Sequence, residues 1–185
     1  MRKYKQNAHL LKLKNIAIKL GATGAKIIKT KDIVFEKEKV FVKCITCQHF
    51  NKKPCCPPFD IKINYKKLIK SYDFGILVWI REEFNKDTFS LIRKESTITL
   101  QKLLLQLEKE AFNLNLCFAV SFIGGSCKLC PDGCPPTKIC INPTDSRLPL
   151  ESVGVNVIKT CRKIGLKLAP FPVKDHLYRV GLLLA

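Results

Sequence analysis

The cysteines of this 185-residue chain are concentrated in two short stretches, and this clustering constrains the fold more than any other feature. The early group lies in KCITCQHFNKKPCCPPFD and comprises Cys44, Cys47, Cys55 and Cys56. The late group lies in CKLCPDGCPPTKIC and comprises Cys127, Cys130, Cys134 and Cys140. Thiols crowded in this way are typical of disulfide frameworks, thiol redox sites or metal centres. Whatever fold the chain adopts must therefore present two thiol-rich loops.

The rest of the composition argues against disulfides. Hydrophobic residues make up 46% of the chain, which is enough for one domain over 1–185 with a core of its own. The opening segment is basic throughout and lacks the apolar stretch and cleavage site of a signal peptide. No apolar run approaches the roughly 18 residues of a membrane span. We therefore expect a cytoplasmic protein, in which clustered thiols stay reduced and serve as metal ligands or catalytic thiols.

The pattern around the two groups predicts an α/β fold, a single domain with a central mainly parallel or mixed sheet flanked by helices. Apolar residues at helical spacing predict helices over 7–20, 61–71, 88–113 and about 150–164. Short apolar runs predict strands over 25–29, 40–43, 73–80 and 116–123 and in the closing RVGLLLA. Each cysteine group follows a predicted strand, where open α/β sheets place their functional loops.

Two cysteines stand outside both groups. Cys117 lies in the apolar run LCFAVSFI, and Cys161 lies in the helical pattern VIKTCRKIG. Because free cysteine is commonly buried, we expect both to be small core residues and not ligands.

The spacing of the late group favours an iron–sulfur centre. Gaps of two, three and five residues let one loop wrap four thiolates around a 4Fe-4S cluster. Zinc sites more often combine two short knuckles across a longer spacer, although Cys130 and Cys134 also fit the knuckle range. Prolines after Cys56 and Cys134 stiffen both loops. The sequence therefore predicts one or two 4Fe-4S clusters and leaves zinc as the alternative.

The chain resembles a cysteine-rich family of unknown function, described as predicted metal-binding proteins, that is common in methanogens and other anaerobes. The resemblance covers most of the chain. It rests on Cys44-Ile-Thr-Cys47 with Cys56-Pro57-Pro58, on Gly125-Ser126-Cys127-Lys128-Leu129-Cys130 with Cys134 and Cys140, on LPLESVGVNVIKTCRKIGL and on YRVGLLLA. The chain departs from the family in having three residues before Cys134 where two are usual, and Ile141 where Arg is usual. The resemblance implies a metal or iron–sulfur protein of anaerobic metabolism without a defined reaction.

The same resemblance implies three ligands in the early group, Cys44, Cys47 and Cys56. The fourth ligand is then Cys55, His49 or no protein group. Three thiolates leave one coordination position open, which is how a metal site performs chemistry instead of only storing electrons. Neighbouring residues in an extended loop point to opposite sides, so Cys55 is also interpretable as an idle thiol next to Cys56. His49 is also interpretable as a polar loop residue.

Positive charge is the other strong signal. The formal net charge is +18, and residues 1–70 carry 18 Lys and Arg against 4 Asp and Glu. A solvated lysine-rich surface is the simplest interpretation. A functional one is docking of an acidic redox protein of the ferredoxin or flavodoxin type, or of a larger enzyme complex. Nucleic acid is disfavoured, because aromatic residues are 9% of the chain and form no stacking motif.

The sequence therefore predicts an iron–sulfur protein that transfers electrons or serves as an accessory redox subunit in anaerobic one-carbon, corrinoid or methanogenic metabolism. One alternative is a structural zinc module that interacts with a macromolecule such as nucleic acid. Another is a thiol oxidoreductase that uses Cys44 and Cys47, although it leaves the other clustered cysteines unexplained. Whether the chain turns over a substrate stays open.

Overall fold

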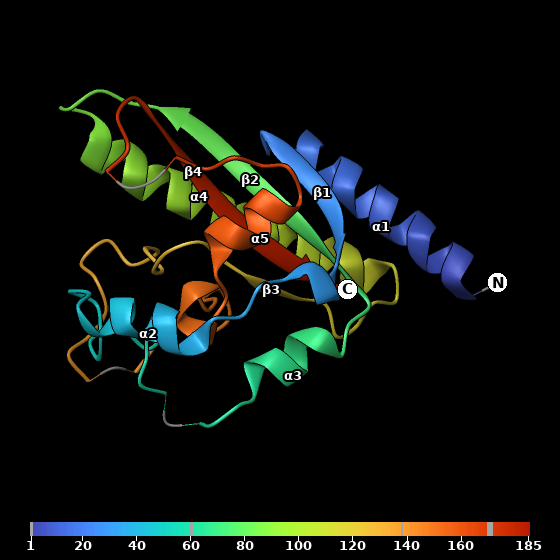
Figure 1. Cartoon of the computed structure of the whole chain (residues 1–185), viewed down its shortest axis with the longest axis horizontal. Coiled ribbons are helices and arrows are strands. Elements are labelled where there is room, and N and C mark those ends of the chain that lie inside the picture. Colours follow the sequence, from blue (N-terminus) through green and yellow to red (C-terminus); the bar gives the residue numbers. More distant parts are fainter. Residues whose placement is uncertain (1, 60, 138, 170–171) are drawn as a thin grey trace.

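The computed structural model of the protein describes residues 2–59, 61–137, 139–169 and 172–185. Its helices and strands are, in chain order, α1 (Arg2–Lys19), β1 (Gly24–Lys29), η1 (Thr30–Asp32), α2 (Lys37–Ile45), α3 (Tyr65–Lys70), β2 (Phe74–Glu83), α4 (Phe89–Asn113), β3 (Val120–Phe122), η2 (Glu151–Val153), α5 (Val157–Lys163) and β4 (His176–Leu184) (Figure 1). The elements η1 and η2 are single turns of 3-10 helix. None of the helices in the described part of the chain is both long and apolar enough to cross a membrane.

A four-stranded sheet with the strand order β1-β2-β4-β3 forms the centre of the fold. Within the described residues, every strand pairing is antiparallel. The central pair, β2 with β4, runs in register from Gly75 opposite Leu184 to Glu83 opposite His176. The prediction of a mainly parallel or mixed sheet is therefore wrong.

The order of the elements explains this error. The chain does contain a strand–helix–strand unit, β2-α4-β3, and its two strands point the same way because both are antiparallel to β4. However, β4 lies between them and pairs with both, so the unit is split and no parallel pair forms. Alternation of strands and helices along a sequence does not show which strand is inserted between them.

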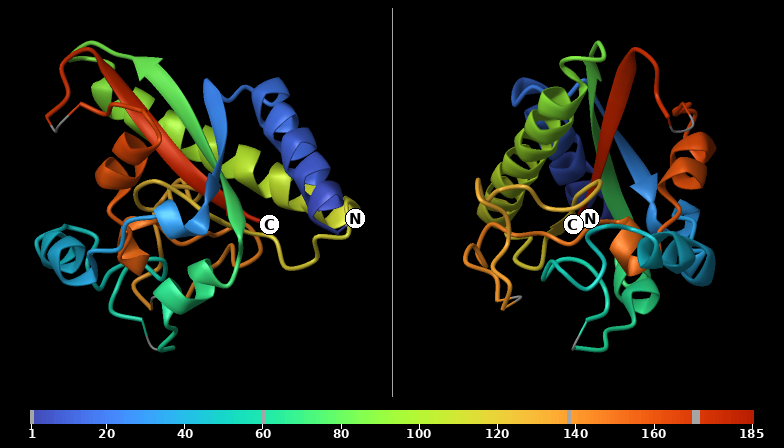
Figure 2. Two further views of the ribbon diagram at one scale, coloured as in Figure 1. Left: turned by 45° about the vertical axis from the view of Figure 1, so that its right-hand side comes forward. Right: turned by 90° about the vertical axis from the view of Figure 1, so that its left-hand side faces the viewer.

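The continuous apolar strands reflect burial on both faces of the sheet. Side chains of β2 alternate between two separate hydrophobic clusters, with Ile76 and Val78 in one and Leu77 in the other. Helices α1 and α4 cover the first face, while α3 and α5 cover the second (Figure 2). An antiparallel strand covered on both sides is apolar throughout, as strands of parallel sheets are.

Most predicted elements are confirmed. The helices predicted over 7–20 and 88–113 correspond to α1 and α4, and Leu100, Leu104 and Leu107 of α4 are fully buried, at the spacing of one helix face. The strands predicted over 25–29, over 73–80 and at the C-terminus correspond to β1, β2 and β4. The helix predicted near 150–164 is divided into η2 and α5, because Gly154 adopts a left-handed conformation between them, with φ of +89°.

One predicted strand is wrong and another is shorter than predicted. The run 40–43 belongs to helix α2, where Phe41 packs edge-on against Phe50 at 5.9 Å, so a tertiary contact overrides the β propensity of Val40 and Val42. The run 116–123 shortens to β3, because a turn with Asn115 at φ of +61° follows α4. That turn exposes Cys117, which was expected to be buried. Cys161 is fully buried, as predicted.

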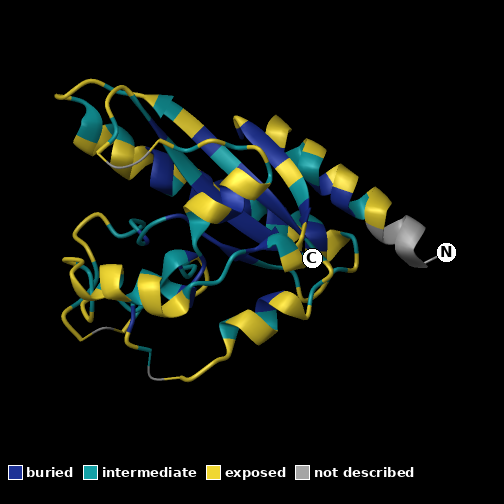
Figure 3. Cartoon of the chain, viewed as in Figure 1, coloured by how far each residue is buried: buried dark blue, intermediate teal, exposed yellow. Residues whose placement is uncertain are grey.

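The two cysteine groups lie together beyond one end of the sheet. In Figure 1 helix α2, the loop after it and the loop after β3 gather at the lower left, away from α1. Figure 3 shows that this region is mostly intermediate or exposed, whereas the sheet and the inner faces of its helices are buried. Helix α2 itself contains no buried residue. Most of the thiols therefore lie near the surface at this end of the sheet, whereas Cys55 and Cys127 are buried at the edge of the core.

Candidate metal centre

The early group begins in the last turn of helix α2 and not after a strand, contrary to the sequence-based expectation. Cys44 lies in that turn, and the amide of Cys47 donates a hydrogen bond of 3.0 Å to the carbonyl of Cys44. The loop then folds back on itself, since the amide of Asn51 donates to the carbonyl of Pro57 at 2.9 Å and Asn51 adopts φ of +55°. This fold-back returns the chain to the end of α2 at Cys56.

Three early thiols share one cavity. Cys44, Cys47 and Cys56 line a cavity of about 690 Å³ together with His49. Burial and the charges of Glu151 and Cys47 raise the pKa of the Cys44 thiol, so Cys44 and Cys47 are electrostatic neighbours. The charge of Cys47 also contributes to the raised pKa of Cys56. The three residues that the family pattern implies as ligands are therefore brought together.

Cys55 is more deeply buried than Cys56, which packs against the same hydrophobic cluster but also lines the cavity. The side chain of Cys55 is buried and belongs to the same hydrophobic cluster as Cys127, seventy-odd positions away in the sequence. The two neighbouring sulfurs, Cys55 Sγ and Cys56 Sγ, lie 4.0 Å apart and share a hydrogen bond. That bond, a backbone hydrogen bond from Cys127 and the charge of Lys53 lower the pKa of Cys55 against the opposing effect of burial. Of the adjacent pair, Cys55 is the thiol that ionises first, and it does so next to the late group.

The late group starts after two glycines that turn the chain away from the sheet. A side chain at Gly124 would place its Cβ 2.3 Å from the carbonyl oxygen of Val180 in β4, so only glycine fits there. Gly125 then adopts φ of +76°, a conformation that favours glycine. The loop leaves β3 at this point and carries Cys127, Cys130, Cys134 and Cys140.

Three late thiols lie close to Cys55. Burial raises the pKa of the Cys134 thiol, and the negative charges of Cys55, Cys130 and Cys127 raise it further. Cys127 is buried, whereas Cys130 and Cys134 are half-buried. Cys140, at the end of the loop, is also half-buried. All ten cysteines of the chain lie in its described part, and each is a free thiol.

Side-chain amides point at two of the late sulfurs. Gln101 of α4 donates through Nε2 to Cys127 Sγ at 3.5 Å and to the carbonyl of Asp145 at 2.7 Å. Asn142 donates through Nδ2 to Cys130 Sγ at 3.5 Å. Hydrogen bonds to the sulfurs are one of the means by which proteins set the potential of thiolate-bound clusters. Sequence reasoning missed both residues, although a glutamine on the apolar face of α4 is an available signal.

The far end of the late loop is fixed by an ion pair with α4. Arg147 donates from Nε to Glu108 Oε1 at 2.8 Å and from Nη2 to Glu108 Oε2 at 2.5 Å. The amide of Ser121 in β3 donates to the same carboxylate at 2.7 Å. Although burial opposes it, the bonds from Arg147 and Ser121 lower the pKa of Glu108. One carboxylate thus joins α4, β3 and the end of the cysteine loop.

Cations surround the thiols. Burial and the charges of Lys53, Arg93 and Arg179 lower the pKa of Lys128. Burial and the charge of Arg93 likewise lower the pKa of Arg179 to about 10. Within the described ranges, none of these four side chains forms an ion pair with a carboxylate. Such a positive field stabilises thiolates and any anionic group that they bind.

The donor set suits a thiolate-bound group of some width. Soft thiols, nearby cations and amide donors aimed at sulfur are the surroundings that thiolate-ligated metals require. In the part of the chain that the structure describes, no three histidine, cysteine or carboxylate side chains lie close enough together to hold a single metal ion.

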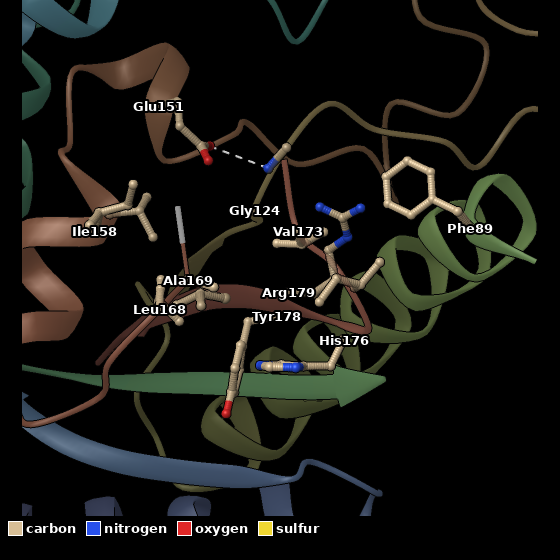
Figure 4. Close-up of a pocket in the computed structure, with 14 residues that line it drawn as sticks. Phe89, Gly124, Glu151, Ile158, Leu168, Ala169, Val173, His176, Tyr178 and Arg179 are labelled. Carbon is tan, nitrogen blue, oxygen red and sulfur yellow. Dashed lines mark hydrogen bonds between the residues drawn. The ribbon is translucent and has the colours of Figure 1, made fainter. Parts of the chain in front are cut away.

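A half-buried carboxyl group, that of Glu151, lines both the cavity of the early thiols and a second cavity. The second cavity, of about 230 Å³, is lined by Glu151 and Arg179 and by apolar side chains such as Val173 (Figure 4). Glu151 also lines the larger cavity beside the early thiols, and it accepts a hydrogen bond of 3.2 Å from the amide of Gly125. Burial raises the pKa of Glu151 and so favours its neutral form. Glu151 had no part in the sequence-based predictions.

Comparison with known protein families gives one match. Residues 26–185 match a family described as predicted metal-binding protein (DUF2284). The matched range contains both cysteine groups and all four strands apart from the first two residues of β1. Neither the curated proteins nor the solved structures yield a significant match.

Proposed function

Because the chain belongs to the family of predicted metal-binding proteins (DUF2284), we propose that it binds iron–sulfur clusters on its two sets of thiols and uses them to transfer electrons. The observation that carries the proposal is the division of the thiols at the Cys55–Cys56 peptide. Cys56 lines the cavity with Cys44 and Cys47, whereas Cys55 is buried with Cys127. One short loop thus contributes a thiol to each set.

Two centres follow from this division. The inner centre comprises Cys127, Cys130 and Cys134 with Cys55 as the fourth ligand, and Cys140 is the competing candidate for that fourth position. The cavity centre comprises Cys44, Cys47 and Cys56. With three protein thiolates, the cavity centre keeps one position open toward the cavity.

The spacing of the sulfurs favours clusters over single ions. A tetrahedral zinc site needs four ligands converging on one atom at about 2.3 Å from each sulfur. No such convergence exists within residues 2–59, 61–137, 139–169 and 172–185. A 4Fe-4S cluster presents four separate irons, so its thiolates stand further apart. Zinc on the same thiols is the competing assignment.

The adjacent thiols suit electron transfer between the centres. Cys55 Sγ and Cys56 Sγ are 4.0 Å apart, so clusters bound on either side would be neighbours, as in two-cluster ferredoxins. The cations Lys53, Arg93 and Lys128 would favour the more negative, reduced form of each cluster. We propose an acidic redox protein of the ferredoxin or flavodoxin type, or a larger complex, as the partner, in cytoplasmic anaerobic metabolism of the one-carbon, corrinoid or methanogenic kind.

Metal analysis of protein prepared without oxygen tests the proposal. We expect brown protein that absorbs broadly at about 400 nm and contains iron and acid-labile sulfide in similar amounts. Changing Cys130→Ser should remove the inner centre and leave the cavity centre, so the iron content falls by about half. Stoichiometric zinc without sulfide, in protein made under iron-replete conditions, would refute the iron–sulfur assignment. Loss of all metal from any single cysteine variant would show that the two sets share one site.

A further inference from the structure

The cavity beside Cys44, Cys47 and Cys56 has the size and wall of a small-molecule site. Its volume of about 690 Å³ lies within the range of about 300–1,000 Å³ that is usual for pockets that enclose organic ligands. Much of its wall is apolar, with Val40 of α2, Phe50 of the early loop, and Val157 and Ile158 at the start of α5. An apolar wall beside a metal centre excludes solvent, and at this volume it also leaves room for the apolar body of an organic ligand.

The charged side chains of the cavity are out of balance. Its described lining contains four lysine and arginine side chains, Lys39, Lys43, Arg93 and Lys159, against two carboxylates, Glu36 and Glu151. Glu36 already accepts hydrogen bonds from Lys159 at 2.8 Å and Lys39 at 3.4 Å. Glu151 is half-buried, accepts a hydrogen bond from a backbone amide and has a raised pKa that favours its neutral form. Both carboxylates of the lining therefore already have hydrogen-bond partners, and the lining keeps an excess of positively charged side chains.

Arg93 is one of the positively charged side chains of the lining that form no ion pair with a carboxylate in the described ranges. It lies in α4 and lines the cavity, and its charge contributes, after burial, to the lowered pKa of Lys128 and Arg179. Its backbone carbonyl accepts a hydrogen bond of 3.3 Å from Arg179 Nη2, but its own guanidinium forms no ion pair with any carboxylate in the described ranges. A guanidinium among other cations, at the wall of a cavity, is matched by a planar or tetrahedral oxyanion.

We propose that this cavity binds a small organic oxyanion, a carboxylate or a phosphate ester with an apolar body, whose charged group is held by Arg93. The apolar body would contact Val40, Val157 and Ile158. The inference rests on the proposed function where it places this ligand beside the open position of the cavity centre. The cavity, its apolar wall and its excess of positive charge are independent of which metal the thiols hold.

Two probes of the same shape separate charge recognition from apolar binding. Benzoate and benzamide differ in charge but hardly in size, and phenyl phosphate carries the other oxyanion. Binding of each to the full, anaerobically prepared protein is measured by saturation-transfer NMR and titration. We expect benzoate or phenyl phosphate to bind more tightly than benzamide by up to about fivefold, the largest factor that one exposed charge pair usually supplies. The stronger of the two oxyanions identifies the ligand as a carboxylate or a phosphate ester.

Three variants locate the binding. Arg93→Gln should abolish the preference for the oxyanion, whereas the matched change of its exposed helix neighbour, Lys94→Gln, should preserve it. Ile158→Trp should fill the apolar wall and weaken benzoate and benzamide alike, and Ile158 is 47% exposed, so the change is compatible with folding. Equal binding of charged and neutral probes, absence of binding, or a preference that survives Arg93→Gln would overturn the proposal.

Iron and sulfide analysis of the same samples separates the two proposals. Oxyanion preference in protein that contains zinc and no sulfide would refute the iron–sulfur assignment and support the inference. Full iron and sulfide content without oxyanion preference would refute the inference alone. A change in the electron paramagnetic resonance signal on adding the oxyanion would further support its place beside the open position.

Discussion

Removing the ion pair that anchors the late loop should cost stability in a predictable amount. In the variant Arg147→Met, Glu108 loses both of its bonds to the guanidinium, at 2.8 and 2.5 Å. The two side chains are only 19% and 15% exposed, so the carboxylate left behind is largely buried. Breaking a fully buried pair costs about 3–5 kcal/mol, and the residual exposure here reduces that to roughly 2–4 kcal/mol. At about 2–4 °C per kcal/mol for a chain of this size, Tm should fall by roughly 4–16 °C.

The pH dependence gives this prediction a second check. The folded-state pKa of Glu108 is lowered, so its contribution to stability is complete above its ordinary pKa of 4.5 and is lost as the pH falls through the lower folded value. The difference in Tm between the wild type and Arg147→Met should therefore be constant near neutral pH. It should shrink as the pH falls through the ordinary carboxyl value of 4.5, and it begins to shrink above that value because burial raises the pKa of the unpaired Glu108 in the variant.

Thermal unfolding followed by circular dichroism measures these differences. Lys109→Gln, an exposed change at the next position of α4, serves as the control and should shift Tm little. A variant Arg147→Met with the Tm of the control at pH 7 would refute the reasoning. So would a Tm difference that grows as the pH falls below 4.5.

Three further predictions concern the proposed centres. Cys55→Ser should lower the iron content by about half while Cys140→Ser leaves it unchanged, as iron analysis would show; the reverse result would make Cys140 the fourth ligand of the inner centre. Gln101→Leu removes an N–H donor from Cys127 Sγ and should lower the reduction potential of one centre in a spectroscopic redox titration. Gln106→Leu is the control and should leave the potential unchanged. Equal potentials in both variants would contradict the role of the bond from Gln101. Reduction by an acidic flavodoxin-type donor should slow steeply between about 0.1 and 1 M salt, because the screening length falls from about 10 to about 3 Å. It should also slow when lysines within 52–70 are changed to Glu. Stopped-flow rates that change with neither perturbation would exclude electrostatic docking there.

The cysteine pattern alone indicates a metal-binding protein and identifies the thiols that are candidate ligands. Thiols crowded around prolines are unusual enough to indicate metal binding without a structure, and the family match agrees with that reading. The sequence also predicts the buried face of α4, because Leu100, Leu104 and Leu107 recur at helical spacing. A feature that depends on one continuous segment, such as a ligand cluster or a helix face, can therefore be predicted from the sequence.

The tertiary structure alone decided the direction of the strands. Periodicity reports that β2 and β4 are buried on both faces, but it is the same for parallel and antiparallel neighbours. Whether β4 pairs between β2 and β3 depends on contacts between segments far apart in the chain, which no local pattern records. For the same reason, the β-like run 40–43 gave no sign of the contact between Phe41 and Phe50 in its helical form.

The partition of the candidate ligands also depends on the fold. Cys55 and Cys56 are consecutive and chemically identical in the sequence, yet one is buried beside Cys127 and the other lines the cavity of Cys44. Only the fold shows that Cys55 packs with the distant Cys127 while Cys56 lines the cavity with the nearby Cys44 and Cys47. Arg93 is positioned by the same packing, since a surface arginine of α4 becomes part of a cavity wall only when α2 and α5 close the other sides.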